Sequence, residues 1–195
     1  MKKLLISGFD PFGGEAINPS YEAVKLLPNV IGEYELTKIE LPTVFGRAAK
    51  IMIEKIEEIR PDAVICVGQA GGRRGITPEV IGINLREASI ADNAGNMPKN
   101  EKIRAGAPDG IFSTLPVRDM VEAIKEEGLP ASLSFSAGAF VCNDLLFSLL
   151  YEFKDTDIKI GFIHVPFLPE QAKADVPSME LSEIARGLRA AIGCL

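Results

Sequence analysis

The chain has 195 residues, of which 47% are hydrophobic and 25% charged, and its net charge is −6. This length is enough for one domain with a sizeable core. The negative net charge is unlike the excess of basic residues that is typical of a nucleic-acid-binding protein. No apolar run is long enough to span a bilayer. We therefore expect a globular protein whose partners include neither nucleic acid nor membrane.

The N-terminus resembles a secretory signal only superficially. Two lysines precede a short apolar run, but Asp10 and Pro11 interrupt it where the apolar region of a signal peptide would continue. The three cysteines form no CxxC pair, and their odd number argues against a disulfide framework. A single histidine leaves too few ligands for a usual zinc site. These features predict a cytoplasmic protein with no metal site.

Apolar strand patterns alternate with amphipathic helix patterns along the chain. Strands are expected at residues 2–8, 33–41, 63–67, 76–86, 132–136 and 157–163, and helices at 19–27, 43–59, 117–127, 142–153 and 178–192. Thr77-Pro78-Glu79 could instead open a helix. Residues 89–116 are irregular, and so long a segment in a compact domain is usually functional or a lid. The alternation predicts an α/β fold: one domain over residues 1–195, a three-layer α/β/α sandwich with a mostly parallel, mixed central sheet.

Functional groups collect at the carboxyl ends of the strands in such a sheet. Cys142 is expected at the start of a helix that follows a strand and a small-residue turn, and His164 follows the last strand. The positive end of the helix should favour the thiolate of Cys142, and the imidazole of His164 is the only one available to accept its proton. A third group should orient that imidazole. The candidates on this edge are Glu79, Asp92, Asn93 and Asp144, and their spacing does not choose among them.

Each of these residues also has a plain structural interpretation. Cys142 could be a packed core cysteine, a lone histidine is more often structural, and Glu79 could be a solvated acid at a helix start. The glycine loops at 8–14 and 68–75 could hold a phosphate, although neither fits a known phosphate-binding pattern. The phenylalanines of the first loop suit a flat, neutral, partly apolar ligand better.

Six motifs in this order make the chain resemble the pyroglutamyl peptidase type I (pyrrolidone-carboxylate peptidase) family. They are GFDPFGG with NPS, GQAGGRRGITPE, DNAGNMP, GAPDGIFSTLP, SFSAGAFVCN and GFIHVPFLPEQ, and the match extends to about Met179. The resemblance implies a cytosolic cysteine peptidase that removes an N-terminal pyroglutamyl residue from peptides through a thioester acyl-enzyme. It also implies an α/β/α sandwich, no cofactor, and a homo-oligomer, either a tetramer or a dimer.

The resemblance also assigns roles by position. It implies that Cys142 is the nucleophile, His164 the general base and Glu79 the third catalytic residue. The residues that it implies for substrate binding are Phe9, Phe12, Asn18, Gln69 and Val141.

The sequence departs from the family pattern at two positions. Val80 follows the glutamate where the family usually has arginine, and EASIADN stands where the family usually has DARIPDN, so that Ser89 replaces a second arginine. Arg73 and Arg86 are the candidates to compensate. The departures motivate one alternative, a related cysteine amidase acting on another small acyl group. A second alternative is a non-catalytic small-ligand-binding module that uses the glycine loops.

Overall fold

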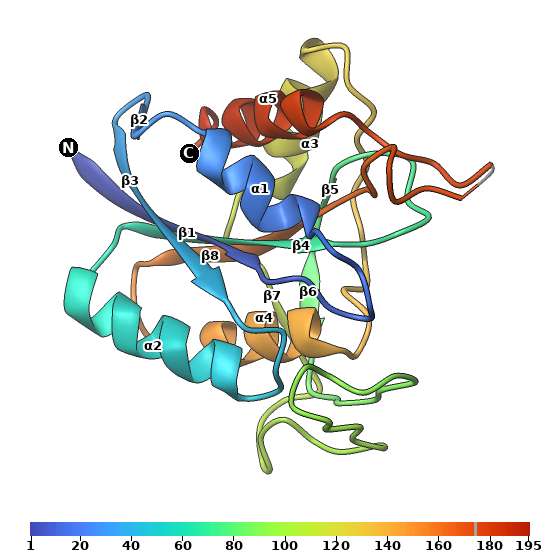
Figure 1. Ribbon diagram of the computed structural model, residues 1–195. Helices are drawn as coiled ribbons and strands as arrows, with labels where there is room; N and C mark the ends of the chain where they lie inside the picture. The colour runs from blue at the N-terminus through green and yellow to red at the C-terminus, as the bar shows by residue number, and fades with distance from the viewer. Residues whose placement is uncertain (174) are drawn as a thin grey trace.

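The computed structural model describes residues 1–173 and 175–195. Its centre is a six-stranded sheet with the strand order β2-β3-β1-β4-β8-β5 (Figure 1). The strands are β1 (Lys2–Phe9), β2 (Val30–Ile31), β3 (Tyr34–Leu41), β4 (Ala63–Gln69), β5 (Thr77–Pro78) and β8 (Lys159–Val165). β1 is parallel to β3 and β4, and β4 to β8, whereas β2 and β5 are antiparallel to their neighbours. The expected mostly parallel, mixed sheet is confirmed.

Helices cover both faces of this sheet (Figure 1). One face packs against α1 (Pro19–Leu26), α3 (Val117–Glu126) and α5 (Leu181–Ile192), and the other against α2 (Arg47–Ile59) and α4 (Val141–Glu152). In β4, Ile65 and Val67 face the first group, while Val64 and Cys66 face the second. Burial on both faces explains why this strand is a continuous apolar run. No helix in residues 1–173 or 175–195 has the length and apolar character that a membrane span requires.

The start of α1 follows from its local sequence. The side chain of Asn18 accepts a hydrogen bond from the backbone N–H of Ser20, and Pro19 occupies the first helical position. The predicted start of this helix is confirmed.

The helix expected from residue 43 begins four residues later, at Arg47. The intervening turn is held by carboxylates from other parts of the chain. The N–H groups of Thr43, Phe45 and Gly46 donate hydrogen bonds to Asp10, Asp92 and Asp144, respectively. These long-range bonds take the place of the first helical turn, which local periodicity could not reveal.

The strand expected at residues 132–136 is wrong. This segment contains one isolated bridge, Glu79 with Ser134, and Phe135 is 67% exposed. Alternating apolar residues predict a strand only if one face is covered, and Phe135 faces solvent instead. The segment is an irregular connection that leads into α4.

The strand expected at residues 76–86 is divided in two. β5 contains Pro78 and pairs with β8 at the edge of the main sheet, where a missing N–H is tolerated. The chain then bends at Val80 and continues as β6 (Ile81–Ile83), which pairs with β7 (Gly110–Phe112) in a separate two-stranded sheet. The side chain of Asn143 in α4 bonds the backbone of Ile83 and so fixes this small sheet against α4.

The parallel strands β1, β4 and β8 all end at the same edge of the sheet (Figure 1). At this edge α1 crosses very close to β1, because Gly8 has no side chain. A Cβ on Gly8 would lie 2.4 Å from the Cα and N atoms of Tyr21 in α1. The loop after β1 therefore folds back tightly over the end of the sheet.

We expect the substitution Gly8→Ala to lower the free energy of unfolding by about 2 kcal/mol, because the α1 backbone would have to move. Urea unfolding followed by circular dichroism measures this change. Leu26→Ala, at an exposed position of the same helix, is the control and should change stability by less than about 0.5 kcal/mol. Equal midpoints for Gly8→Ala and wild type would contradict the close approach of α1.

Candidate active site

Three side chains from separate elements lie together at the carboxyl edge of the sheet. His164 is the next-to-last residue of β8, Glu79 directly follows β5, and Cys142 is the second residue of α4. Nδ1 of His164 lies 2.7 Å from Oε1 of Glu79, and both side chains are buried. Glu79 is thus the candidate that contacts the imidazole. The other three candidates, Asp92, Asn93 and Asp144, bind elsewhere.

Gly68 makes the room in which the sulfur of Cys142 lies. This glycine is paired with His164 in the parallel register, so a side chain on it would point to the same face as the imidazole. A Cβ there would lie 2.9 Å from Sγ of Cys142 and 2.7 Å from the ring of Phe162, which in turn contacts the His164 ring at 4.7 Å between centroids. Because neighbouring strands are about 4.8 Å apart, this arrangement sets the sulfur beside the imidazole.

The thiol of Cys142 is not acidified by its position at the start of α4. Burial raises its pKa to about 12, and the negative charge of Glu79 acts in the same direction. A helix N-terminus contributes roughly 0.3–1 kcal/mol, which is less than one pKa unit. The expectation that the helix would generate a resting thiolate is therefore wrong, because the surroundings of the sulfur outweigh the helix.

The other two groups have complementary charge states. Burial lowers the pKa of His164 below its ordinary value, although the hydrogen bond with Glu79 acts against this. Burial alone would raise the pKa of Glu79. The hydrogen bonds from His164 and Arg73 act in the opposite direction, and the pKa of Glu79 lies below its ordinary value. At neutral pH the site thus holds a thiol, a neutral imidazole and a carboxylate. An ionised carboxylate only accepts hydrogen bonds, so Nδ1 carries the proton and Nε2 is the acceptor that faces the reaction.

The first turn of α4 offers backbone N–H groups. Its N-cap residue, Phe140, makes no side-chain hydrogen bond to the helix, so no capping side chain occupies these donors. The N–H of Cys142 belongs to this turn. A developing negative charge next to the sulfur would therefore find donors already in place.

Partly exposed aromatic rings surround this helix start. The ring of Phe140 lies 6.0 Å from that of Phe12 and 5.1 Å from that of Phe45, centroid to centroid. Phe9 is buried, with its ring 6.3 Å from that of Phe162 in the core. Sequence reasoning singled out Phe9 and Phe12 but missed Phe45 and Phe140. The position of Phe140 directly before the helix of Cys142 is the signal that could have identified it.

The remaining expected substrate residues differ in what they offer. Both polar atoms of the Asn18 side chain are already hydrogen-bonded, the nitrogen to the Asp10 carbonyl and the oxygen to Ser20, so Asn18 holds the loop after β1. The Val141 side chain is buried in the core. Gln69 is partly exposed, and its Oε1 accepts a hydrogen bond from Gln171.

Two carboxylates join the loops around the aromatic rings. Asp10 accepts hydrogen bonds from Thr43 and Asn93. Asp92 accepts them from the backbone of Phe45 and from both the backbone and the side chain of Asn96. The loops at 9–13, 43–46 and 92–96 are therefore held as one unit, which sets the positions of Phe12 and Phe45.

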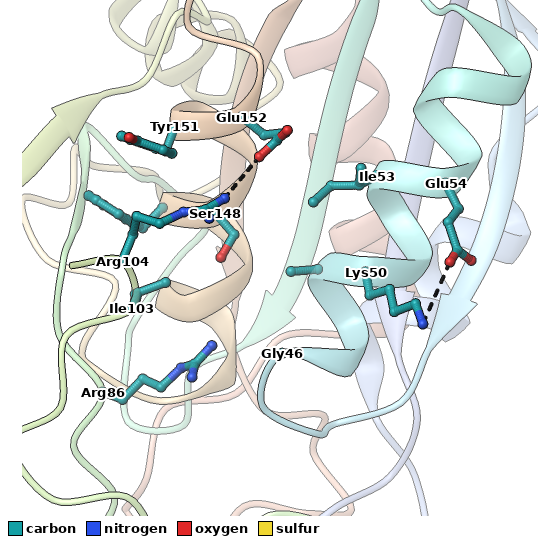
Figure 2. Close-up of a pocket in the computed structure, with 12 residues that line it drawn as sticks. Gly46, Lys50, Ile53, Glu54, Arg86, Ile103, Arg104, Ser148, Tyr151 and Glu152 are labelled. Atoms are coloured by element: carbon teal, nitrogen blue, oxygen red, sulfur yellow. Dashed lines mark hydrogen bonds and ion pairs between the residues drawn. The ribbon is translucent and has the colours of Figure 1, made fainter. Parts of the chain in front are cut away.

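Neither arginine that could replace the missing family arginines is free. Arg73 is bound to Glu79 at 2.7 Å, and Nε of Arg86 is bound to the buried carboxylate of Asp144 at 2.7 Å. Figure 2 shows Arg86 at a cleft between α2 and α4. The cleft has a volume of about 370 Å³, and its lining includes none of Cys142, His164 and Glu79. Within residues 1–173 and 175–195, no group of three His, Cys, Asp or Glu side chains could hold a metal ion.

Comparisons with known families, sequences and structures all identify similar proteins of one kind over nearly the whole chain. A family model described as pyroglutamyl peptidase matches residues 2–195. The pyrrolidone-carboxylate peptidases of Streptococcus suis and Staphylococcus carnosus are 50% and 51% identical to this chain; each alignment covers 99% of this chain and 92% of the relative. The crystal structure of Bacillus amyloliquefaciens pyroglutamyl peptidase I has a TM-score of 0.96 and 45% identity, and covers 100% of this chain and 96% of that one. The pyrrolidone carboxyl peptidase from Thermococcus litoralis has a TM-score of 0.94 and 37% identity, with 98% and 92% coverage.

We expect Gly68→Ala to abolish most nucleophilic reactivity at Cys142, because the added methyl group would displace both the sulfur and the Phe162 ring. The rate of Cys142 alkylation by iodoacetamide should fall roughly tenfold or more. Peptide mapping by mass spectrometry measures this rate, and thermal unfolding verifies that the variant is folded. A folded Gly68→Ala protein that alkylates at the wild-type rate would show that the sulfur lies elsewhere.

Proposed function

The chain belongs to the pyroglutamyl peptidase family, and we propose that Cys142, His164 and Glu79 carry out its cysteine-peptidase reaction. The enzyme hydrolyses the bond after an N-terminal pyroglutamyl residue of a peptide. The observation that carries the assignment of residues is the 2.7 Å contact between His164 and Glu79, together with the sulfur of Cys142 next to Gly68, the residue that pairs with His164 in the sheet.

In the first half of the reaction, Nε2 of His164 takes the proton of the Cys142 thiol. The sulfur then attacks the carbonyl carbon of the pyroglutamyl residue, and the carbonyl oxygen gains a negative charge. Backbone N–H groups at the start of α4 donate hydrogen bonds to that oxygen; one such donor is typically worth about 3 kcal/mol. The protonated imidazole gives its proton to the leaving amine, the C–N bond breaks, and a thioester remains on Cys142.

In the second half, the same imidazole activates water. Nε2 accepts a proton from a water molecule whose oxygen attacks the thioester carbonyl. The C–S bond breaks, the sulfur recovers the proton, and pyroglutamate leaves. Glu79 keeps the proton of His164 on Nδ1 throughout and stabilises the imidazolium that forms in each half.

Selection of the substrate follows from its neutral lactam ring. The partly exposed rings of Phe12 and Phe140 suit the faces of such a ring, while Phe9 packs against Phe162 in the core below the loop. Gln69, with its oxygen held by Gln171, would direct its amide N–H to the lactam carbonyl. The backbone of Val141, rather than its buried side chain, faces the substrate, while Asn18 acts by holding the loop. A substrate with a charged amino terminus would leave these groups unpaired and be rejected.

The wider setting is part of the same proposal. None of the three cysteines is paired in a disulfide, which agrees with a cytoplasmic enzyme that works as a single peptidase domain. The family resemblance further implies a homo-oligomer, a dimer or tetramer. Sedimentation equilibrium at micromolar concentration separates these states, and a monomer alone would remove that part of the proposal.

We expect the wild-type protein to release aminomethylcoumarin from its pyroglutamyl amide, and Cys142→Ala to lower kcat by at least about a thousandfold. Fluorescence at pH 7.5 measures both. Cys194→Ala is the matched control and should retain wild-type activity, because this partly exposed cysteine lies in the C-terminal segment outside the site. Full activity of Cys142→Ala would refute the assignment of the nucleophile. A wild-type enzyme that cleaves other acyl amides and not this one would refute the specificity.

A further inference from the structure

Arg73 binds Glu79, one of the three candidate catalytic residues. It belongs to the glycine-rich loop after β4, and its guanidinium makes three hydrogen bonds. One nitrogen, NH1, donates to Oε1 of Glu79 at 2.7 Å and to Oγ1 of Thr77 at 2.5 Å, and the other, NH2, donates to the Ser136 carbonyl at 3.0 Å. A planar guanidinium with this many partners has a fixed orientation.

The bond to Glu79 falls on the same oxygen that holds the imidazole. Oε1 of Glu79 accepts from both Arg73 and Nδ1 of His164, each at 2.7 Å. The other oxygen, Oε2, is buried and has no hydrogen-bond partner among the described residues. Since Glu79 is fully buried, Arg73 supplies both the second donor and the opposite charge that an ionised interior carboxylate requires.

The other two bonds connect Arg73 to the rest of the site. The Ser136 carbonyl belongs to the irregular segment that leads into α4 and so to Cys142. Thr77 lies in β5 opposite His164, and its hydroxyl is also 3.4 Å from the His164 carbonyl. One side chain is thus tied to the supports of all three candidate catalytic residues.

We infer that Arg73 is the positioning residue of this enzyme: it holds the Glu79 carboxylate in register with His164 and ties that pair to the segment that carries Cys142. The inference rests on the proposed roles of Cys142, His164 and Glu79. Arg73 is called a positioning residue because it acts through Glu79.

This role has a consequence for protonation that a merely structural role lacks. The enzyme needs a neutral His164 as its base, so kcat/KM falls as the pH drops through the pKa of His164, which lies below its ordinary value of 6.5. The positive charge of Arg73 contributes to that low pKa. Removing the charge makes the first proton bind to the Glu79–His164 pair more easily, and the acid limb of the profile moves to higher pH.

The test compares the pH profiles of Arg73→Met, Arg73→Lys and Arg74→Met, in the full-length protein with the pyroglutamyl coumarin substrate. In Arg73→Met we expect the midpoint of the acid limb of kcat/KM to move about one unit to higher pH, and kcat to fall roughly tenfold to a hundredfold. Arg73→Lys keeps the positive charge but loses the planar guanidinium with its several N–H donors. Its acid limb should therefore stay at the wild-type pH while kcat falls about tenfold. Arg74 is exposed, is adjacent in sequence and lines the same surface cavity of about 600 Å³, and its variant should match wild type.

An unshifted acid limb in Arg73→Met would overturn the inference, as would an equal shift in Arg74→Met. If Arg73→Met is too unstable to purify, Arg73→Lys decides alone, since wild-type kcat in that variant would contradict the need for the guanidinium. Failure of the proposed function is distinguishable: it would appear as an inactive wild type or an active Cys142→Ala, whatever the Arg73 variants do.

Discussion

A buried carboxylate that must stay charged is the constraint on which the site depends. Glu79 has no access to solvent, so its charge is stable only if the interior provides donors, and His164 and Arg73 provide them at the same oxygen. This requirement fixes the proton of His164 on Nδ1 and leaves Nε2 as the hydrogen-bond acceptor of the imidazole. The thiol and the imidazole are both neutral at rest. In the proposed mechanism His164 therefore takes the proton of Cys142 as the sulfur attacks, and no thiolate–imidazolium pair has to exist beforehand.

The fold delivers these groups by close approach of backbone elements. Gly68 leaves space for the Cys142 sulfur above β4, and Gly8 lets α1 cross the end of β1 so that the loop with Phe12 returns over the site. Both glycines lie at the carboxyl edge of parallel strands, where side chains from separate segments converge. The carboxylates of Asp10 and Asp92 then join the loops around the aromatic rings.

Much of this could be predicted from the sequence, and the failures have physical reasons. Continuous apolar runs such as residues 63–67 predicted the buried strands, and Asn18-Pro19-Ser20 predicted the start of α1, because these signals are local. The turn at 43–46 and the irregular segment at 132–136 were mispredicted, because long-range hydrogen bonds and the absence of a covering layer decided them. The contact of Cys142 with Gly68 and the two bonds on Glu79 join residues far apart in the chain, which no periodicity encodes. The family motifs named Glu79 where spacing had left four candidates open, but they gave no indication that burial keeps the thiol neutral.

The chain has a single histidine, which makes the central claim directly measurable. Protein labelled with 15N-histidine and free of any tag would give the tautomer and the pKa of His164 by nuclear magnetic resonance. The account predicts a neutral ring at pH 7 with its proton on Nδ1, and a pKa below 6.5. A proton on Nε2, or an imidazolium at pH 7, would contradict the proposed arrangement of Glu79, His164 and Cys142.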